Sequence, residues 1–127
     1  MPVRGIRGAT TTEADTAEAI RYATRELLAE MMAANGLDPA DVASVIFTVT
    51  PDLTAEQPAR AARDMGWTEA ALLCVSEMVV PGGLPRCLRV LIHWNTDVHP
   101  EAIHHVYLHA AARLRPDRAV QTGQPHT

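Results

Sequence analysis

The alternation of strand-like and helix-like segments along the 127 residues is the feature that most constrains the fold of this chain. Residues 43–50 form a β-branched run bounded by turn residues, which is typical of a buried strand. Residues 16–34 repeat apolar side chains at helical spacing, and the helix-ending pair Asn35-Gly36 follows them. Further strands are predicted at residues 3–9, 71–79 and 88–94, and further helices at residues 58–66 and 100–112. This order predicts an α+β fold in which one mixed β-sheet is packed with helices.

The chain length predicts a single domain that is large enough to bury a core. From Arg115 onward the sequence becomes polar and contains proline, so we expect a folded domain over residues 1–117 and a flexible tail over residues 118–127. At the start of the first helix, Asp15 and Glu18 have the spacing of a capping box, so Asp15 is the expected N-cap.

Charge and composition exclude several functional classes. The net charge of −4 argues against a nucleic-acid surface, because phosphate neutralisation needs a basic face. No apolar run is long enough to span a membrane, and without a signal peptide the expected location is cytoplasmic. Cys74 and Cys87 are too far apart for a Cys-x-x-Cys motif and should be reduced thiols. His105 and His109 lack a third ligand nearby, so we expect no metal there.

Arginines spread along the chain, together with one carboxylate, are the main functional signal. Their guanidinium groups are planar, permanently charged forks that match carboxylates. Glu77 lies in an apolar strand, where a carboxylate without a partner is costly. The pattern predicts a site for a small molecule with several negative charges. The candidate residues are Arg7, Arg63, Arg89, Arg115 and Glu77, whereas Arg21, Arg25, Arg86 and Arg113 are expected to be solvated surface residues.

Several linked segments, in this order along the chain, resemble the monofunctional trimeric chorismate mutases of bacteria. Any one of them is weak evidence, but together they cover residues from Arg4 to about Asp117. The segments are Arg4-Gly5-Ile6-Arg7-Gly8-Ala9-Thr10-Thr11, Thr50-Pro51-Asp52-Leu53, Pro58-Ala59-Arg60-Ala61-Ala62-Arg63, Gly82-Gly83-Leu84, Cys87-Leu88-Arg89-Val90, His105-Val106-Tyr107-Leu108 and Leu114-Arg115-Pro116-Asp117.

The resemblance implies an isomerase that rearranges chorismate to prephenate in phenylalanine and tyrosine biosynthesis, without a metal or a cofactor. It also implies a pseudo α/β barrel assembled as a homotrimer, with active sites in clefts between neighbouring subunits. By the same resemblance, Arg89 would face the ether oxygen and a carboxylate, and Glu77 with the main chain near Cys74 would bind the ring hydroxyl. Arg7 would bind a substrate carboxylate.

The remaining site residues implied by the resemblance lie around this centre. Tyr107 would hydrogen-bond the side-chain carboxylate, and Arg63 and Arg115 would close the mouth of the pocket. Ala59, Arg60 and Leu73 would line its rim or wall. Arg60 and Leu73, with Gln57, depart from the residues expected of the family, and we expect them to alter substrate affinity more than the reaction.

Two other functions stay open at the level of the sequence. One is a trimeric hydrolase of reactive enamines or imines that uses a single arginine to hold a carboxylate. That function leaves Glu77 and the other arginines without a role. The other is a non-catalytic module that binds an acid of the aromatic pathway, for which binding of chorismate without conversion is expected.

Overall fold

The structure of the protein is a computed structural model that describes residues 1–114. Its centre is a five-stranded sheet in the order β3-β2-β4-β1-β5. The elements are β1 (Val3–Thr11), α1 (Ala17–Asn35), η1 (Pro39–Asp41), β2 (Val42–Val49), α2 (Ala59–Asp64), β3 (Ala71–Ser76), β4 (Cys87–Asn95), η2 (Pro100–Ala102), β5 (Val106–Tyr107) and η3 (His109–Arg113), where η marks short 3-10 helices. The predicted α+β fold with one mixed sheet is confirmed.

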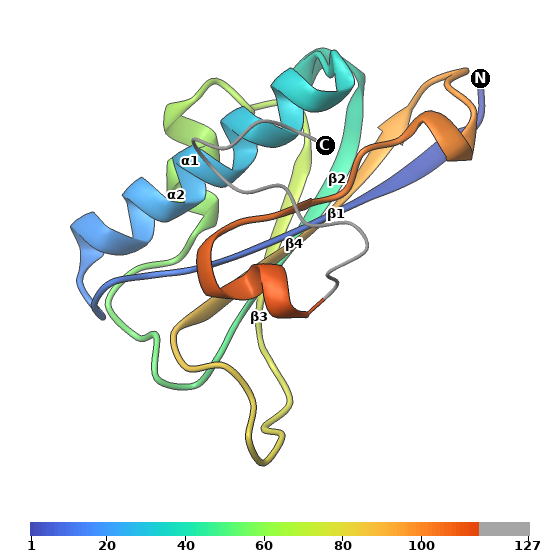
Figure 1. The fold of residues 1–127 in the computed structure, drawn as a ribbon. Helices are drawn as coiled ribbons and strands as arrows, with labels where there is room; N and C mark the ends of the chain where they lie inside the picture. Colours follow the sequence, from blue (N-terminus) through green and yellow to red (C-terminus); the bar gives the residue numbers. More distant parts are fainter. Residues whose placement is uncertain (115–127) are drawn as a thin grey trace.

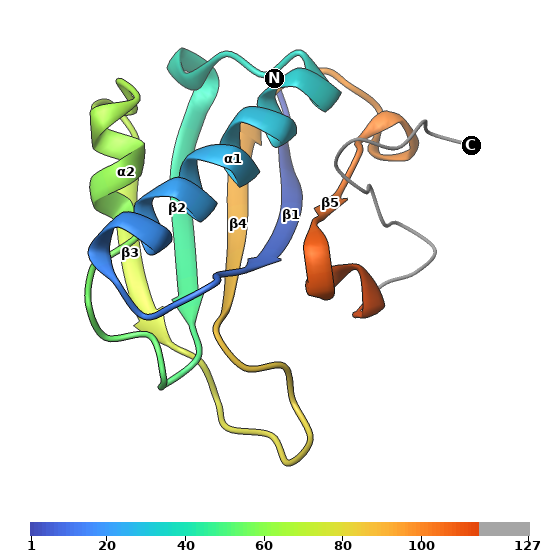
Figure 2. The ribbon, with the colours of Figure 1, turned by 60° about the vertical axis from the view of Figure 1, so that its left-hand side comes forward.

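The sheet is mixed because its two inner strand pairs are antiparallel and its two outer pairs are parallel. β4 pairs antiparallel with β1 and with β2, whereas β3 is parallel to β2 and β5 is parallel to β1. Segments far apart in the sequence therefore lie side by side, with the first strand between β4 and the short β5 (Figure 2). This arrangement brings residues from both ends of the chain onto one surface.

One face of the sheet is covered by α1 (Figure 1), which crosses the strands diagonally, while α2 lies beside it near β3 (Figure 2). Leu27, Leu28 and Met31 of α1 are fully buried in the core. The side chains of α1 lie tightly against β1 at Gly8, where an added Cβ would lie 2.5 Å from Sδ of Met31. Since side chains alternate along a strand, Arg7 points to the opposite face of the sheet. We call that opposite surface the open face.

The start of α1 differs from the prediction by one residue. Thr16 is the N-cap and its hydroxyl accepts from the amide of Ala19, so Asp15 as the cap was wrong. The Asp15 carboxylate instead accepts hydrogen bonds from the amides of Thr54 and Ala55 and from the Thr54 hydroxyl. The Thr54 side chain, and then these amides, lower the pKa of Asp15. Asp15 therefore ties the loop before α1 to the loop before α2.

The predicted helix over residues 100–112 was wrong. The segment forms two 3-10 helices around the short strand β5, which pairs with Gly8 and Ala9 of β1. The apolar spacing matched a helix, but the edge of β1 offers backbone partners, and Leu108 donates to the Ala9 carbonyl at 2.9 Å. His109 has a φ of +53°, which a helix does not allow. The last described segment is therefore an edge of the sheet and not a helix packed on it.

The predicted strand over residues 71–79 is also shorter, because β3 ends at Ser76. The connection from there to β4 extends beyond the end of the sheet (Figure 2). The tail predicted for residues 118–127, and the last three residues of the domain predicted for 1–117, lie outside the described residues. None of the helices in residues 1–114 has the length and apolar character needed to cross a membrane.

Candidate active site

A cavity of about 250 Å³ on the open face brings together four of the predicted site residues. Arg7 comes from β1, Arg89 from β4, Tyr107 from β5, and Glu77 from the residue after β3. The cavity is lined by Arg7, Gly8, Ala9, Ile46, Thr48, Glu77, Arg89, Val90, Leu91 and Tyr107. Residues separated by up to a hundred positions in the sequence thus share one site.

Strand register places the two arginines near each other. Arg89 lies opposite Ala9 of β1, and Arg7 lies opposite Leu91, two residues further along β4. Diagonal neighbours of this kind on one face of a sheet are about 7–8 Å apart. Two guanidinium groups at this spacing can bind different parts of one small anion.

Glu77 is held against Arg89 at the wall of the cavity. Its amide donates to the Val49 carbonyl at 2.8 Å, which continues the pairing of β3 with β2 by one residue. Its Oε1 lies 2.7 Å from Nε of Arg89 and accepts from the Thr48 hydroxyl at 2.9 Å. The Glu77 side chain is 19% exposed, so the nearby cation compensates a carboxylate that is mostly removed from water.

Two polar atoms of this cavity are buried without a hydrogen-bond partner among the described residues. They are Nε of Arg89 and the hydroxyl of Tyr107. The Arg89 nitrogen is close to Glu77, but its hydrogen is not aligned with the carboxylate, so the contact is ionic only. Buried polar groups in proteins are nearly always paired, and each exception calls for an explanation. A polar ligand in the cavity would satisfy both atoms.

The other implied binding residues form a second group, away from this cavity. Cys74 points to the face of the sheet that the helices cover, and it lines a separate pocket with Gln57. Burial raises the pKa of the Cys74 thiol, while the Ala59 backbone and the Arg63 cation act in the opposite direction, so all three residues are neighbours. Leu73 lies on the open face, 57% exposed and opposite Ile46.

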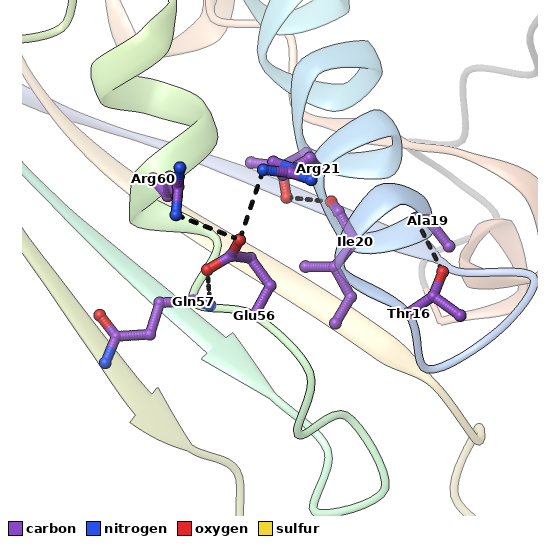
Figure 3. Close-up of polar contacts among 8 residues, drawn as sticks. Thr16, Ala19, Ile20, Arg21, Glu56, Gln57 and Arg60 are labelled. Atoms are coloured by element: carbon purple, nitrogen blue, oxygen red, sulfur yellow. Dashed lines mark hydrogen bonds and ion pairs between the residues drawn. The ribbon is translucent and has the colours of Figure 1, made fainter.

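Arg60 belongs to this second group and is paired with a residue that the sequence analysis did not single out. Its Nη1 lies 4.0 Å from the Glu56 carboxylate, which also lies 3.7 Å from Nη1 of Arg21 and accepts from the Gln57 amide (Figure 3). The expectation that Arg21 is solvated was wrong, because its side chain is only 28% exposed. The spacing of four residues between Glu56 and Arg60 was the available signal.

Arg115 lies outside the described residues. His109 is paired with Glu26 at 2.8 Å, and within residues 1–114 no three potential metal-ligating side chains are clustered. Thr48 was missed, although its place in an alternating strand put it on the same face as Ile46.

Known proteins are similar to this chain in both sequence and fold. Residues 3–118 match the model of the family described as chorismate mutase type I. A protein of Thermus thermophilus named chorismate mutase AroH is 57% identical over 116 residues, covering 91% of this chain and 95% of its own length. One of Bacillus subtilis with the same name is 46% identical over 118 residues, covering 92% and 93%.

A solved structure of a chorismate mutase from Clostridium thermocellum superposes with a TM-score of 0.85 at 52% identity. The match covers 87% of this chain and 98% of that one. The sequence motifs, the cavity with its two arginines and one glutamate, and these similarities agree with one another. The chain belongs to the chorismate mutase type I family.

Proposed function

We propose that the chain is a cytoplasmic chorismate mutase, the isomerase that converts chorismate to prephenate for phenylalanine and tyrosine biosynthesis. The observation that carries this proposal is the cavity in which Arg7, Arg89, Glu77 and Tyr107 meet. The names of the relatives, which match over nearly their whole length, support the same reaction.

The chemistry suits a site made of positioned charges. The reaction is an intramolecular Claisen rearrangement of a dianion, with no proton transfer and no covalent enzyme intermediate. Catalysis then requires holding the side chain of the substrate folded over its ring, which reduces the entropic cost. It also requires a fixed cation at the ether oxygen, because negative charge builds there as the carbon–oxygen bond breaks.

Four side chains of the cavity have roles in this reaction. Arg89 faces the ether oxygen and supplies the fixed positive charge there. Arg7 binds a substrate carboxylate, and Tyr107 donates its buried hydroxyl to the side-chain carboxylate. Glu77 binds the ring hydroxyl and holds Arg89 in place.

We further propose that the protein is a homotrimer whose sites lie between subunits. In one chain, Arg63, Arg60, Ala59 and Cys74 are on the helical side of β3, away from the cavity that contains Arg7. Both groups can contact one substrate only if a neighbouring subunit supplies one of them. Apolar side chains exposed near the edge of the sheet support such an interface: Leu73, Val75, Met78, Val79 and Val80.

The loss of chorismate absorbance, followed with purified protein, tests the proposed activity. Conversion without any added cofactor, and unchanged by a chelator, is the expected result. Binding of chorismate without conversion would identify a non-catalytic binding module. A protein that leaves chorismate unchanged but hydrolyses enamines would be the hydrolase. Either result would refute the proposal.

Replacing Tyr107 by Phe should weaken substrate binding without destabilising the fold. The hydroxyl is buried and unpartnered in the free protein, so its removal takes away a desolvated group and no hydrogen bond. A hydrogen bond to a charged ligand group contributes about 1.5–3 kcal/mol, so we expect the Michaelis constant to rise roughly tenfold or more. Steady-state kinetics and thermal unfolding measure the two effects. A Michaelis constant unchanged from wild type would remove Tyr107 from the binding site.

Mixing two impaired variants should restore activity if the site is shared between subunits. Arg7→Ala and Arg63→Ala are each expected to lower kcat/KM, and they alter the two separate groups of residues. In randomly mixed trimers, about a quarter of the sites combine an intact Arg7 from one subunit with an intact Arg63 from its neighbour. Activity should therefore rise towards a quarter of wild type after unfolding and refolding together.

The control for this experiment is the double variant R7A/R63A refolded with either single variant, which contains no restored pair. A mass in solution near three times 13.8 kDa is expected for the wild type. Absence of restoration in mixed trimers would mean that both arginines serve the site of a single chain.

A further inference from the structure

Residues at the end of β2 form hydrogen bonds with both ends of the loop that connects Glu77 to β4, the strand that contains Arg89. At the first end, the amide of Glu77 donates to Val49 at 2.8 Å. At the second end, the amide of Cys87 donates to the Thr50 hydroxyl at 2.9 Å, and the Thr50 amide donates to the Cys87 carbonyl at 3.0 Å. The two residues of the ion pair are thus anchored on one short stretch of backbone.

Asp52 extends this anchor by two residues. Its Oδ2 accepts from the amide of Arg86 at 2.9 Å, and its Oδ1 accepts from the Thr50 hydroxyl at 2.5 Å. The Thr50 hydroxyl is the main cause of the lowered pKa of Asp52, and the Arg86 amide and guanidinium contribute in the same direction. The carboxylate is therefore charged at neutral pH, and it accepts hydrogen bonds from Thr50, the residue after β2, and from Arg86, the residue before β4.

Arg86 itself is held in an uncommon conformation. Its φ of +47° lies in the left-handed region, which residues with a Cβ rarely adopt unless their surroundings fix them. Its Nε donates to the Thr12 carbonyl at 3.0 Å, and its own carbonyl accepts from the Thr12 amide at 2.9 Å. Arg86 is exposed, as expected of a surface residue, but its side chain and its backbone are both hydrogen-bonded to Thr12.

We propose that Arg86 and Asp52 are positioning residues of the isomerase, which fix where the chain enters β4 and thereby hold Arg89 against Glu77. Arg86 stands three residues before Arg89, and its contacts reach β1 through Thr12 and the end of β2 through Asp52. Both neighbours of β4 are thereby locked to it at the end that contains the cavity. This inference rests on the proposed function, because it concerns the cation of that reaction.

The test compares two arginines that make the same kind of contact at opposite ends of one strand pair. Arg4 donates its Nε to the Val98 carbonyl at 3.0 Å, as Arg86 does to Thr12, but it pairs with Trp94, far along β4 from Arg89. Arg86→Ala should lower kcat about tenfold with a Michaelis constant within about threefold of wild type, because a displaced Arg89 mainly loses contacts of the transition state. Arg4→Ala should keep kcat within about twofold.

A third variant separates positioning from folding. Arg86→Gly removes the guanidinium contact and also removes the strain of the positive φ, so it should fold at least as well as Arg86→Ala. It should show the same loss of kcat with an unchanged melting temperature. Equal losses in Arg4→Ala, or wild-type kcat in both Arg86 variants, would overturn the proposal.

The position of Arg89 can also be followed without substrate, in a measurement that does not depend on the proposed activity. Nε of Arg89 is buried, so a displaced Arg89 would expose it to water. Its hydrogen exchange, measured by NMR, should be faster in both Arg86 variants than in wild type, whereas Arg4→Ala should leave it unchanged. If the wild type had no mutase activity, the proposed function would fail while this exchange would still test the anchor. Unchanged exchange in the Arg86 variants would refute the positioning role in either case.

Discussion

Arg89→Ala should lower kcat by about a hundredfold to a thousandfold while the chain stays folded. Negative charge develops on the ether oxygen only as the bond breaks, so a cation held there stabilises the transition state more than the substrate. Arg89 is suited to this role because its neighbours fix it: Ala9 and Thr48 flank it in the sheet, and Glu77 lies 2.7 Å from its Nε. Steady-state kinetics measure the loss.

The folded state of this variant can be checked independently. The Arg89 side chain is 41% exposed, and ion pairs of this kind contribute about 0–1 kcal/mol to stability, so circular dichroism and thermal unfolding should change little. Arg89→Lys keeps the charge but not the planar fork, and it should also be strongly impaired. Turnover close to wild type in Arg89→Ala would remove Arg89 from the centre of the mechanism.

The parts of the fold that local sequence determines were predicted well. The helix predicted for residues 16–34 is Ala17–Asn35, and the strand predicted for residues 43–50 is Val42–Val49. The failure at residues 100–112 has a different cause. There, apolar spacing favoured a helix, but the free edge of β1 supplied backbone partners to Val106 and Tyr107. Pairing between distant segments is a tertiary effect, and periodicity within a segment does not contain it.

The candidate site divides in the same way. Arg7, Glu77 and Arg89 were recognisable because each is a charged residue in a strand or in a specific motif, and all three line one cavity. The roles of Asp52 and Arg86 could not be predicted, because they depend on how β4 meets the end of β2. The separation of Arg63 from Arg7 was also hidden, since the sequence does not state which face of the sheet each residue occupies.

The second large effect is expected at Glu77, where Glu77→Ala should lower kcat about a hundredfold and Glu77→Gln about tenfold. The carboxylate does two things in the proposed mechanism: it binds the ring hydroxyl, and it holds Arg89 by charge. Glutamine keeps a hydrogen-bonding group of the same size but loses the charge, so its effect should be the smaller one. Alanine removes both, and a displacement of about 1 Å at a reacting centre is enough for a loss of this size.

A matched control exists elsewhere in the chain. Glu26 is buried to the same degree as Glu77, with 18% against 19% of the side chain exposed, and it lies 2.8 Å from its own basic partner, His109. Glu26→Ala removes an equivalent pair outside the cavity, so it should leave kcat within about twofold of wild type. If both alanine variants lost activity equally, the effect of Glu77 would be one of general stability. If neither lost activity, Arg89 would be positioned by the sheet alone, and Glu77 would have no part in the reaction.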